Sequence, residues 1–94
     1  MKLNVKEVML MKLLLAEDEK DLNHALTKIL EIKGYEVDSV FDGQAAVDSG
    51  FSNDYDGIIL DVMMPKMDGW EVCREIRKNS KVPIIMLTAR SDER

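Results

Sequence analysis

A single cysteine, no long apolar run and no excess of positive charge set the first limits on this sequence. One cysteine excludes an internal disulfide framework and fits a reducing compartment. No apolar run approaches the roughly 20 residues that a membrane-spanning helix needs. Glycine-rich phosphate loops are absent, so neither a P-loop nor a dinucleotide-binding motif is present. Acidic residues outnumber basic ones by 18 to 13, which disfavours binding to a nucleic-acid backbone.

The chain is short, and its first ten residues stand apart from the rest. Ninety-four residues are enough for one small domain. Charges interrupt the apolar residues of segment 1–10, so this segment lacks a signal-peptide pattern, and Met11 resembles a second start. We therefore expect residues 1–10 to be a leader or N-terminal extension and residues 11–94 to form a soluble cytoplasmic domain.

Four short apolar runs, at residues 13–16, 35–40, 58–60 and 82–87, alternate with helical patterns. Continuous runs of valine, isoleucine and leucine of this length are typical of strands that are covered on both faces, as in a parallel sheet. Parallel strands need crossover connections. The order βαβαβαβ therefore predicts an α/β domain with helices on both faces of the sheet.

Apolar spacing and capping residues locate three helices. The first is expected to begin at a cap on Asp21, and its apolar positions 22, 25, 26, 29 and 30 fall on one face. Gly34 stands where a left-handed C-cap belongs. A short, weak helix is expected at residues 44–49. The third helix follows Asp68, which together with Glu71 resembles a capping box.

Acidic or hydroxyl side chains follow three of the four apolar runs. Glu17 and Asp18 follow the first run, Asp61 ends the third and Thr88 ends the fourth. Ligands of an open parallel sheet bind beyond the carboxyl ends of its strands. If the first and third strands are neighbours, three carboxylates converge on one patch. Carboxylates that close repel one another unless a cation intervenes, and hard oxygen ligands suit Mg²⁺.

Asp61 is a candidate nucleophile at such a patch. A carboxylate can attack a phosphoryl group and form an acyl phosphate. A divalent cation and fixed dipoles would offset the charge on the transferring oxygens, and Thr88 would donate a hydrogen bond to the bound anion. The alternative is that Asp61 is a helix cap or turn residue and that residues 17–19 are a charged loop at a helix N-terminus.

Four segments of the sequence resemble the receiver domain of two-component response regulators. In order, they are LLLAEDE at 13–19, DG at 42–43, ILDVMMPKMDG at 59–69 and VPIIMLTAR at 82–90. The last two, at this spacing, are highly specific, and the similarity runs from about residue 11 to the last residue. The resemblance implies a flavodoxin-like (CheY-like) doubly wound parallel sheet. It also implies a phosphoacceptor in a two-component phosphorelay, which is a signalling role rather than an enzyme.

The resemblance further implies a magnesium site. Asp18 matches the main Mg²⁺ carboxylate, and Glu17 would assist it through water. Asp61 would contribute a carboxylate oxygen. Met63 matches the position whose backbone carbonyl coordinates the ion, so its side chain is incidental.

The same resemblance implies how a phosphoryl group is received. Asp61 matches the phosphoacceptor, which a partner sensor histidine kinase would phosphorylate in a Mg²⁺-dependent reaction. Thr88 matches the switch hydroxyl that moves toward the phosphoryl group. The backbone N–H of Ala89 would help to hold that group.

Family members continue beyond the point where this sequence stops. They have another helix, a fifth strand and a fifth helix, which carry a lysine against the phosphoryl group and a switch aromatic. The resemblance therefore implies that residues 11–94 are a truncated receiver domain with impaired switching. It is most similar to the subfamily with a winged-helix DNA-binding output domain. Since no such domain is present in these 94 residues, DNA binding would belong to a longer parent.

The fourth apolar run has a further consequence in the family's strand order, 2-1-3-4-5. Without a fifth strand, residues 83–87 would form an apolar, uncharged edge of the sheet. Edges of this kind tend to pair with other strands. We expect the chain to associate through this edge with a copy of itself, with a complementing fragment or, as the least favoured case, with its own N-terminal segment at residues 3–10.

Two alternative functions stay open. A phosphohydrolase with an aspartyl-phosphate intermediate usually needs a second aspartate two residues after the nucleophile, where this sequence has Met63. A non-phosphorylated, self-associating interaction domain would carry the acidic cluster only as a relic.

Overall fold

The structure is a computed structural model that describes residues 11–87, and it contains alternating strands and helices. In chain order, these are β1 (Lys12–Ala16), α1 (Lys20–Ile32), β2 (Glu36–Val40), α2 (Gly43–Ser52), β3 (Gly57–Asp61), α3 (Gly69–Arg77) and β4 (Ile84–Leu87). The order βαβαβαβ is the predicted one. Each strand lies within about two residues of an expected apolar run.

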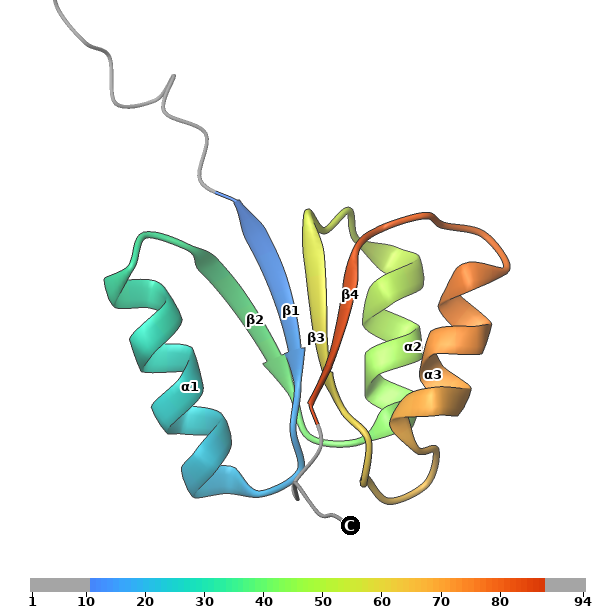
Figure 1. The fold of residues 1–94 in the computed structure, drawn as a ribbon, viewed down its shortest axis with the longest axis horizontal. Coiled ribbons are helices and arrows are strands. Elements are labelled where there is room, and N and C mark those ends of the chain that lie inside the picture. The colour runs from blue at the N-terminus through green and yellow to red at the C-terminus, as the bar shows by residue number, and fades with distance from the viewer. Residues whose placement is uncertain (1–10, 88–94) are drawn as a thin grey trace, which may run out of the picture.

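The four described strands form one parallel sheet in the order β2-β1-β3-β4. This confirms the predicted doubly wound α/β architecture, in which β1 and β3 are central neighbours. Figure 1 shows α1 on one side of the sheet and α2 with α3 on the other. Within residues 11–87, β4 is an outer strand and no fifth strand is present.

The main core lies between the sheet and the helices α2 and α3. Alternate strand residues point into it, since Leu14 and Ala16 on β1 and Ile58 and Leu60 on β3 all belong to this cluster. Helix residues such as Val72 and Ile76 complete it. The intervening strand residues therefore point to the other face, where α1 is the only described helix.

The helix ends agree with the predicted signals except at the start of α1. Glu19, not the expected Asp21, is the N-cap, and its carboxylate accepts a 3.1 Å hydrogen bond from the Leu22 N–H. Gly34 has a φ of 101° and follows the last turn of α1, as expected of a left-handed C-cap. The capping box of Asp68 and Glu71 is present at the start of α3. The weak second helix is longer than expected, because it begins one residue earlier, after the N-cap Asp42, and continues three residues further, to Ser52.

The apolar stripe on α1 is not buried as a whole. Leu26 and Leu30 are half-buried, but Leu22, Ala25 and Ile29 are exposed. The fully buried residue of this helix is the polar Asn23. The reason is geometric: α1 covers β1 and β2, and no described element lies beside it over β3 and β4.

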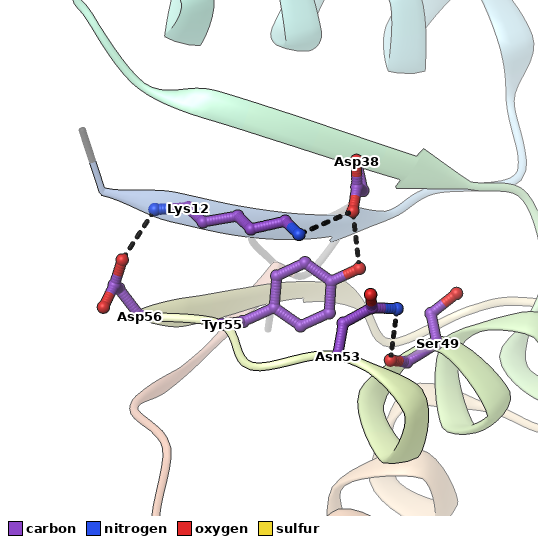
Figure 2. A network of polar contacts seen from close by, with 6 residues as sticks. All are labelled: Lys12, Asp38, Ser49, Asn53, Tyr55 and Asp56. Atoms are coloured by element: carbon purple, nitrogen blue, oxygen red, sulfur yellow. Dashed lines mark hydrogen bonds and ion pairs between the residues drawn. The ribbon is translucent and has the colours of Figure 1, made fainter. Parts of the chain in front are cut away.

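A polar network joins the three strands β2, β1 and β3 near the start of β1. The Tyr55 hydroxyl donates a 2.8 Å hydrogen bond to Asp38, whose carboxylate also lies 3.8 Å from the Lys12 ammonium. Figure 2 shows both contacts reaching the same carboxylate, with Lys12 also bonded through its backbone to Asp56. The Lys12 ammonium lies 5.4 Å from the centre of the Tyr55 ring, within cation–π range.

Burial raises the pKa of the Tyr55 phenol, and the hydrogen bond to Asp38 and the negative charge of that carboxylate raise it further. The hydroxyl therefore stays protonated and acts as a donor at any physiological pH.

None of the three described helices combines the length and the apolar composition that crossing a bilayer requires.

The network predicts the effect of removing one hydroxyl. Tyr55→Phe is expected to lower the free energy of unfolding by about 1–2 kcal/mol, because the Asp38 carboxylate loses a donor. Urea denaturation followed by circular dichroism measures this change. Tyr35→Phe is the matched control, since no hydrogen bond of the Tyr35 hydroxyl is found within residues 11–87. Equal stabilities of the two variants would contradict the role given to the network.

Candidate functional site

Three carboxylates lie together at the carboxyl ends of β1 and β3. One oxygen from each of Glu17, Asp18 and Asp61 lies within 4.8 Å of the other two. The pairing of β1 with β3 produces this arrangement, because Ala16 is in register with Leu60 and the next residues of both strands are acidic. The convergence expected from the sequence is therefore present in the structure.

Two of these side chains are buried and the third is exposed. Asp61 is 6% exposed and Glu17 is 4% exposed, whereas Asp18 reaches solvent. They lie in an open groove of about 570 Å³ that is also lined by Leu22, Leu26, Met63 and Leu87. A small ion or an anionic group can thus reach Asp61 through this groove.

Backbone N–H groups orient the two buried carboxylates. The Met63 N–H donates to Asp61 Oδ1 at 3.2 Å, and the Glu19 N–H donates to Glu17 Oε2 at 2.8 Å. Both bonds join a residue to the second one after it, so each carboxylate is held by the turn that immediately follows its strand. The backbone of the two turns therefore orients these side chains, with no basic partner among residues 11–87.

The cluster stores electrostatic repulsion. Burial raises the pKa of Asp61 above its ordinary value, and the nearby Asp18 charge adds to the increase, while the Met63 N–H opposes it. Burial also raises the pKa of Glu17, against the opposing effect of the Glu19 N–H. No lysine or arginine of residues 11–87 forms an ion pair with any of the three. A cation would relieve this repulsion.

The donor set fits a hard divalent cation. Carboxylate oxygens are the ligands that Mg²⁺ prefers, and Mg²⁺ keeps several of its waters, so a site with three carboxylates and an open side suits it. Glu17, Asp18 and Asp61 are the residues that would hold the ion. Nothing in the donor set favours a softer metal, because neither histidine nor cysteine belongs to the cluster.

Glycine is required where α3 approaches the end of β3. A Cβ on Gly69 would lie 2.5 Å from the Asp61 carbonyl oxygen and 2.9 Å from the Val62 Cα. The Gly69 N–H donates to the Val62 carbonyl at 2.9 Å. The first turn of α3 is therefore packed directly on the backbone that carries Asp61.

Asn23 is a supporting residue that the sequence analysis missed. It is fully buried, and its side-chain amide donates to the Glu17 carbonyl at 3.0 Å and to the Val40 carbonyl at 3.1 Å. One side chain of α1 thus joins the ends of β1 and β2 beside the acidic cluster. The signal available in the sequence was the polar type of Asn23 within the predicted helix. Because Asn23 does not lie on the apolar stripe, the spacing predicted it to be exposed.

The other predicted site residues are less informative. Met63 lines the groove with an exposed side chain. Thr88 and Ala89 lie outside the described residues. The loop that carries Met63 continues to Lys66, which has a positive φ of 72° and whose ammonium lies 3.5 Å from the carboxylate of the N-cap residue Asp42.

Comparison with known proteins gives a consistent family assignment. Residues 13–94 match the family model described as response regulator receiver domain. Curated relatives named response regulator ArlR, from Staphylococcus saprophyticus and Staphylococcus aureus, are each 44% identical over 81 residues, which cover 86% of this chain and 37% of the relative. The chain thus spans little more than a third of the length of these relatives.

Solved structures with the same fold include metal-bound receivers. The response regulator TrrA of Thermotoga maritima, in complex with Mg²⁺ and BeF, has a TM-score of 0.83 and 41% identity, with 87% of this chain and 72% of that chain covered. The receiver domain of a Pseudomonas aeruginosa sensor histidine kinase, with a magnesium ion in its active-site cleft, has a TM-score of 0.84 and 38% identity, with 87% and 70% covered.

A third structure contains a signalling partner. It is the complex of the histidine kinase ThkA with TrrA, which has a TM-score of 0.81 and 41% identity to this chain, with 90% of this chain and 74% of that chain covered. The magnesium ions, BeF and the kinase belong to those proteins, to which this chain is similar in sequence and fold.

The raised pKa values of Asp61 and Glu17 predict how stability depends on pH when divalent cations are removed. The folded carboxyls keep their protons at pH values where the unfolded ones have lost them. The contribution of these two groups to the free energy of unfolding is therefore fully present below the ordinary Asp and Glu range and is lost as the pH rises through the raised values. Asp61→Asn cannot ionise, so it should remove part of this loss and be more stable than the wild type at neutral pH.

Thermal unfolding in a chelator, measured from acidic to neutral pH, tests this expectation. Asp54→Asn removes an exposed carboxylate outside the cluster and is the matched control. Identical pH profiles of stability for the wild type and Asp61→Asn would contradict a raised pKa of Asp61 in the folded domain.

Proposed function

This chain belongs to the response regulator receiver family, and on that premise we propose that Asp61 accepts a phosphoryl group from the phosphohistidine of a sensor histidine kinase in the cytoplasm. The observation that carries the proposal is the placement of Asp61, a buried carboxylate at the end of β3 that shares a groove with Glu17 and Asp18. The kinase complex of the related TrrA supports a kinase as the donor.

The reaction is a transfer between two nucleophiles. An Asp61 carboxylate oxygen forms a bond to phosphorus, and the bond from phosphorus to the histidine nitrogen breaks. The electron pair of that bond stays with the imidazole, which leaves as the neutral base when its other nitrogen carries a proton. The product is an acyl phosphate on Asp61, and the groove holds it at the surface of the domain.

Residues of this chain prepare Asp61 for that step. The Met63 N–H holds one carboxylate oxygen, so the second oxygen is the nucleophile. Glu17 and Asp18 would hold a Mg²⁺ ion together with Asp61, and the Met63 carbonyl would be a further ligand. When bound, Mg²⁺ supplies positive charge that offsets the charge of the incoming phosphoryl oxygens. Thr88 and Ala89 would contact the phosphoryl group from the end of β4.

The chain of 94 residues is proposed to be phosphorylated but to switch poorly. The described sheet has β4 as its outer strand, so a lysine and an aromatic residue that follow a fifth strand in the family have no counterpart in residues 11–87. In a longer chain with an output domain, phosphorylation would regulate transcription through DNA binding.

The free side of β4 is proposed to pair with a second copy of the chain. The carbonyls of Pro83 and Leu87 bond to β3, so those of Ile84 and Met86 point to the free side. The strand carries no charged residue, and Ile85 is 59% exposed. An uncharged edge with free backbone groups is the kind that pairs with another strand.

Phosphorylation is tested with acetyl phosphate and Mg²⁺, followed by intact mass spectrometry. The wild type should gain the mass of one phosphoryl group. Asp61→Asn should gain none, and Asp54→Asn should behave as the wild type. A chelator should abolish the reaction, and Mg²⁺ alone should change the emission of Trp70, which stands next to Gly69, in the wild type but not in Asp61→Asn.

Two results would reject the phosphoacceptor proposal. One is the same mass gain in Asp61→Asn, which would place the acceptor elsewhere. The other is no gain in a wild type whose circular dichroism shows a folded domain, which would favour a non-phosphorylated interaction domain. Repeated turnover of a generic phosphate ester would instead indicate a phosphohydrolase.

The edge proposal is tested by placing a charge on β4. Ile85→Lys is expected to lower the average mass measured by light scattering at high concentration, because a lysine on an edge strand opposes pairing. Gln44→Lys, on an exposed position of α2, adds the same charge elsewhere. An unchanged mass in Ile85→Lys, or a folded and monomeric wild type, would reject pairing through β4.

A further inference from the structure

The loop that carries Met63 contains a strained turn. The Met67 N–H donates to the Pro65 carbonyl at 2.7 Å, so a single residue, Lys66, separates donor from acceptor. Among residues 11–87, Lys66 is the one non-glycine residue with a positive φ, which is 72°. A hydrogen bond of this span around a positive φ is the pattern of the rarer, strained form of the γ-turn. Strain of this kind persists only where neighbouring structure imposes it.

The first residue of α2 packs directly on this turn. Gly43 is buried, and its N–H donates a long, 3.5 Å hydrogen bond to the Pro65 carbonyl. A Cβ on Gly43 would overlap the Met67 carbonyl oxygen and would lie 2.6 Å from the carbonyl carbon. Because both are backbone atoms, they cannot move aside as the end of a flexible side chain does. The contact between α2 and the turn therefore requires glycine at position 43.

The N-cap of α2 makes a second contact with the turn. One carboxylate oxygen of Asp42 accepts a 2.8 Å hydrogen bond from the Ala45 N–H, and the other lies 3.5 Å from the Lys66 ammonium. The Ala45 N–H and the Lys66 charge lower the pKa of Asp42, so this carboxylate stays ionised. The Lys66 side chain is mostly exposed, so the ion pair contributes less than the backbone contact at Gly43.

We infer that Gly43 and Asp42 are positioning residues for the metal site, because they hold the turn at Lys66 and thereby the Met63 backbone. This role rests on the proposed function, in which the Met63 carbonyl would be a Mg²⁺ ligand. Met63 lies two residues before the turn, and its N–H is bonded to Asp61. Neither Asp42 nor Gly43 lines the acidic groove, so their effect on a bound ion passes through the loop.

Two glycines of α2 give a matched comparison in the full chain. Gly43→Ala should raise the Mg²⁺ dissociation constant by about tenfold, because the new Cβ displaces the turn that holds Met63. Gly50→Ala adds the same methyl group to the same helix, 3.3 Å from the end of the flexible Ile76 side chain, and should leave the constant unchanged. Titration of Mg²⁺, followed by the emission of Trp70, measures both constants.

Two substitutions of Lys66 separate backbone geometry from charge. Both Lys66→Gly and Lys66→Val remove the ion pair with Asp42. Glycine adopts a positive φ without strain, whereas a β-branched valine strongly disfavours it. Lys66→Gly should therefore keep the Mg²⁺ dissociation constant within about twofold of the wild-type value, since exposed ion pairs contribute little. Lys66→Val should raise it by about fivefold or more, because the turn opens.

The position of the loop is also measured without metal. In a chelator, the backbone amide resonance of Met63 in a nuclear magnetic resonance spectrum reports on its hydrogen bond to Asp61. This resonance should shift in Gly43→Ala and Lys66→Val and stay near its wild-type position in Gly50→Ala and Lys66→Gly. Circular dichroism shows whether each variant is folded. If Gly43→Ala does not fold, the two Lys66 variants carry the same comparison.

Three results would overturn this role of the start of α2. An unchanged Mg²⁺ dissociation constant and an unchanged Met63 resonance in a folded Gly43→Ala would show that α2 does not position the loop. Equal losses of affinity in Gly43→Ala and Gly50→Ala would indicate general destabilisation, and equal losses in Lys66→Gly and Lys66→Val would reject the dependence on the strained turn.

The binding of Mg²⁺ to the wild type separates this role from the proposed function. A wild type that binds no Mg²⁺ would reject the metal site of the proposed function and this role together. A wild type that binds the ion, with any of the three results above, would reject this role alone.

Discussion

The mutual repulsion of three carboxylates, held together by the sheet, is the constraint on which the rest of this structure depends. The parallel pairing of β1 with β3 brings Glu17, Asp18 and Asp61 within 4.8 Å of one another, and burial of two of them raises their pKa values. The unfavourable arrangement persists because backbone bonds of the sheet and turns impose it. A domain built only for stability would place apolar side chains there.

The surrounding residues hold this arrangement by close packing and by hydrogen bonds of the backbone. Because Gly69 has no side chain, the first turn of α3 packs directly on the Asp61 backbone. The Asn23 amide donates a hydrogen bond to the Glu17 carbonyl at the end of β1. The Met63 N–H fixes the orientation of the Asp61 carboxylate. None of these contacts, all within residues 11–87, comes from a positively charged side chain, so they leave the negative charge of the cluster uncompensated.

Much of the fold and of the site could be predicted from local patterns. The apolar runs and the acidic residues that end them predicted the parallel sheet and the convergence of Asp18 with Asp61, because parallel strands carry their carboxyl ends to one edge. Gly34 and the pair of Asp68 and Glu71 predicted their helix ends because caps depend on a few neighbouring residues.

The errors concern properties that depend on tertiary neighbours. The apolar spacing of α1 predicted one buried face, but which part of that face is covered depends on what lies beside the helix, and the polar Asn23 took the innermost position. The choice of Glu19 over Asp21 as N-cap depends on how the chain leaves β1. Periodicity in the sequence contains neither kind of information.

The alternation of β3 makes the position of Asp61 an all-or-none property. Leu60 points into the core with α2 and α3, while Asp61 points to the opposite face. The loop that precedes the strand can change length with little effect on this geometry, whereas the turn that follows it holds the Asp61 carboxylate through the Met63 N–H. Inserting or deleting one residue within the strand would instead exchange its two faces, so that the Asp61 carboxylate would point into the apolar core. Relatives of such a domain are therefore expected to keep both the spacing inside β3 and the turn that follows it, and to vary in length elsewhere.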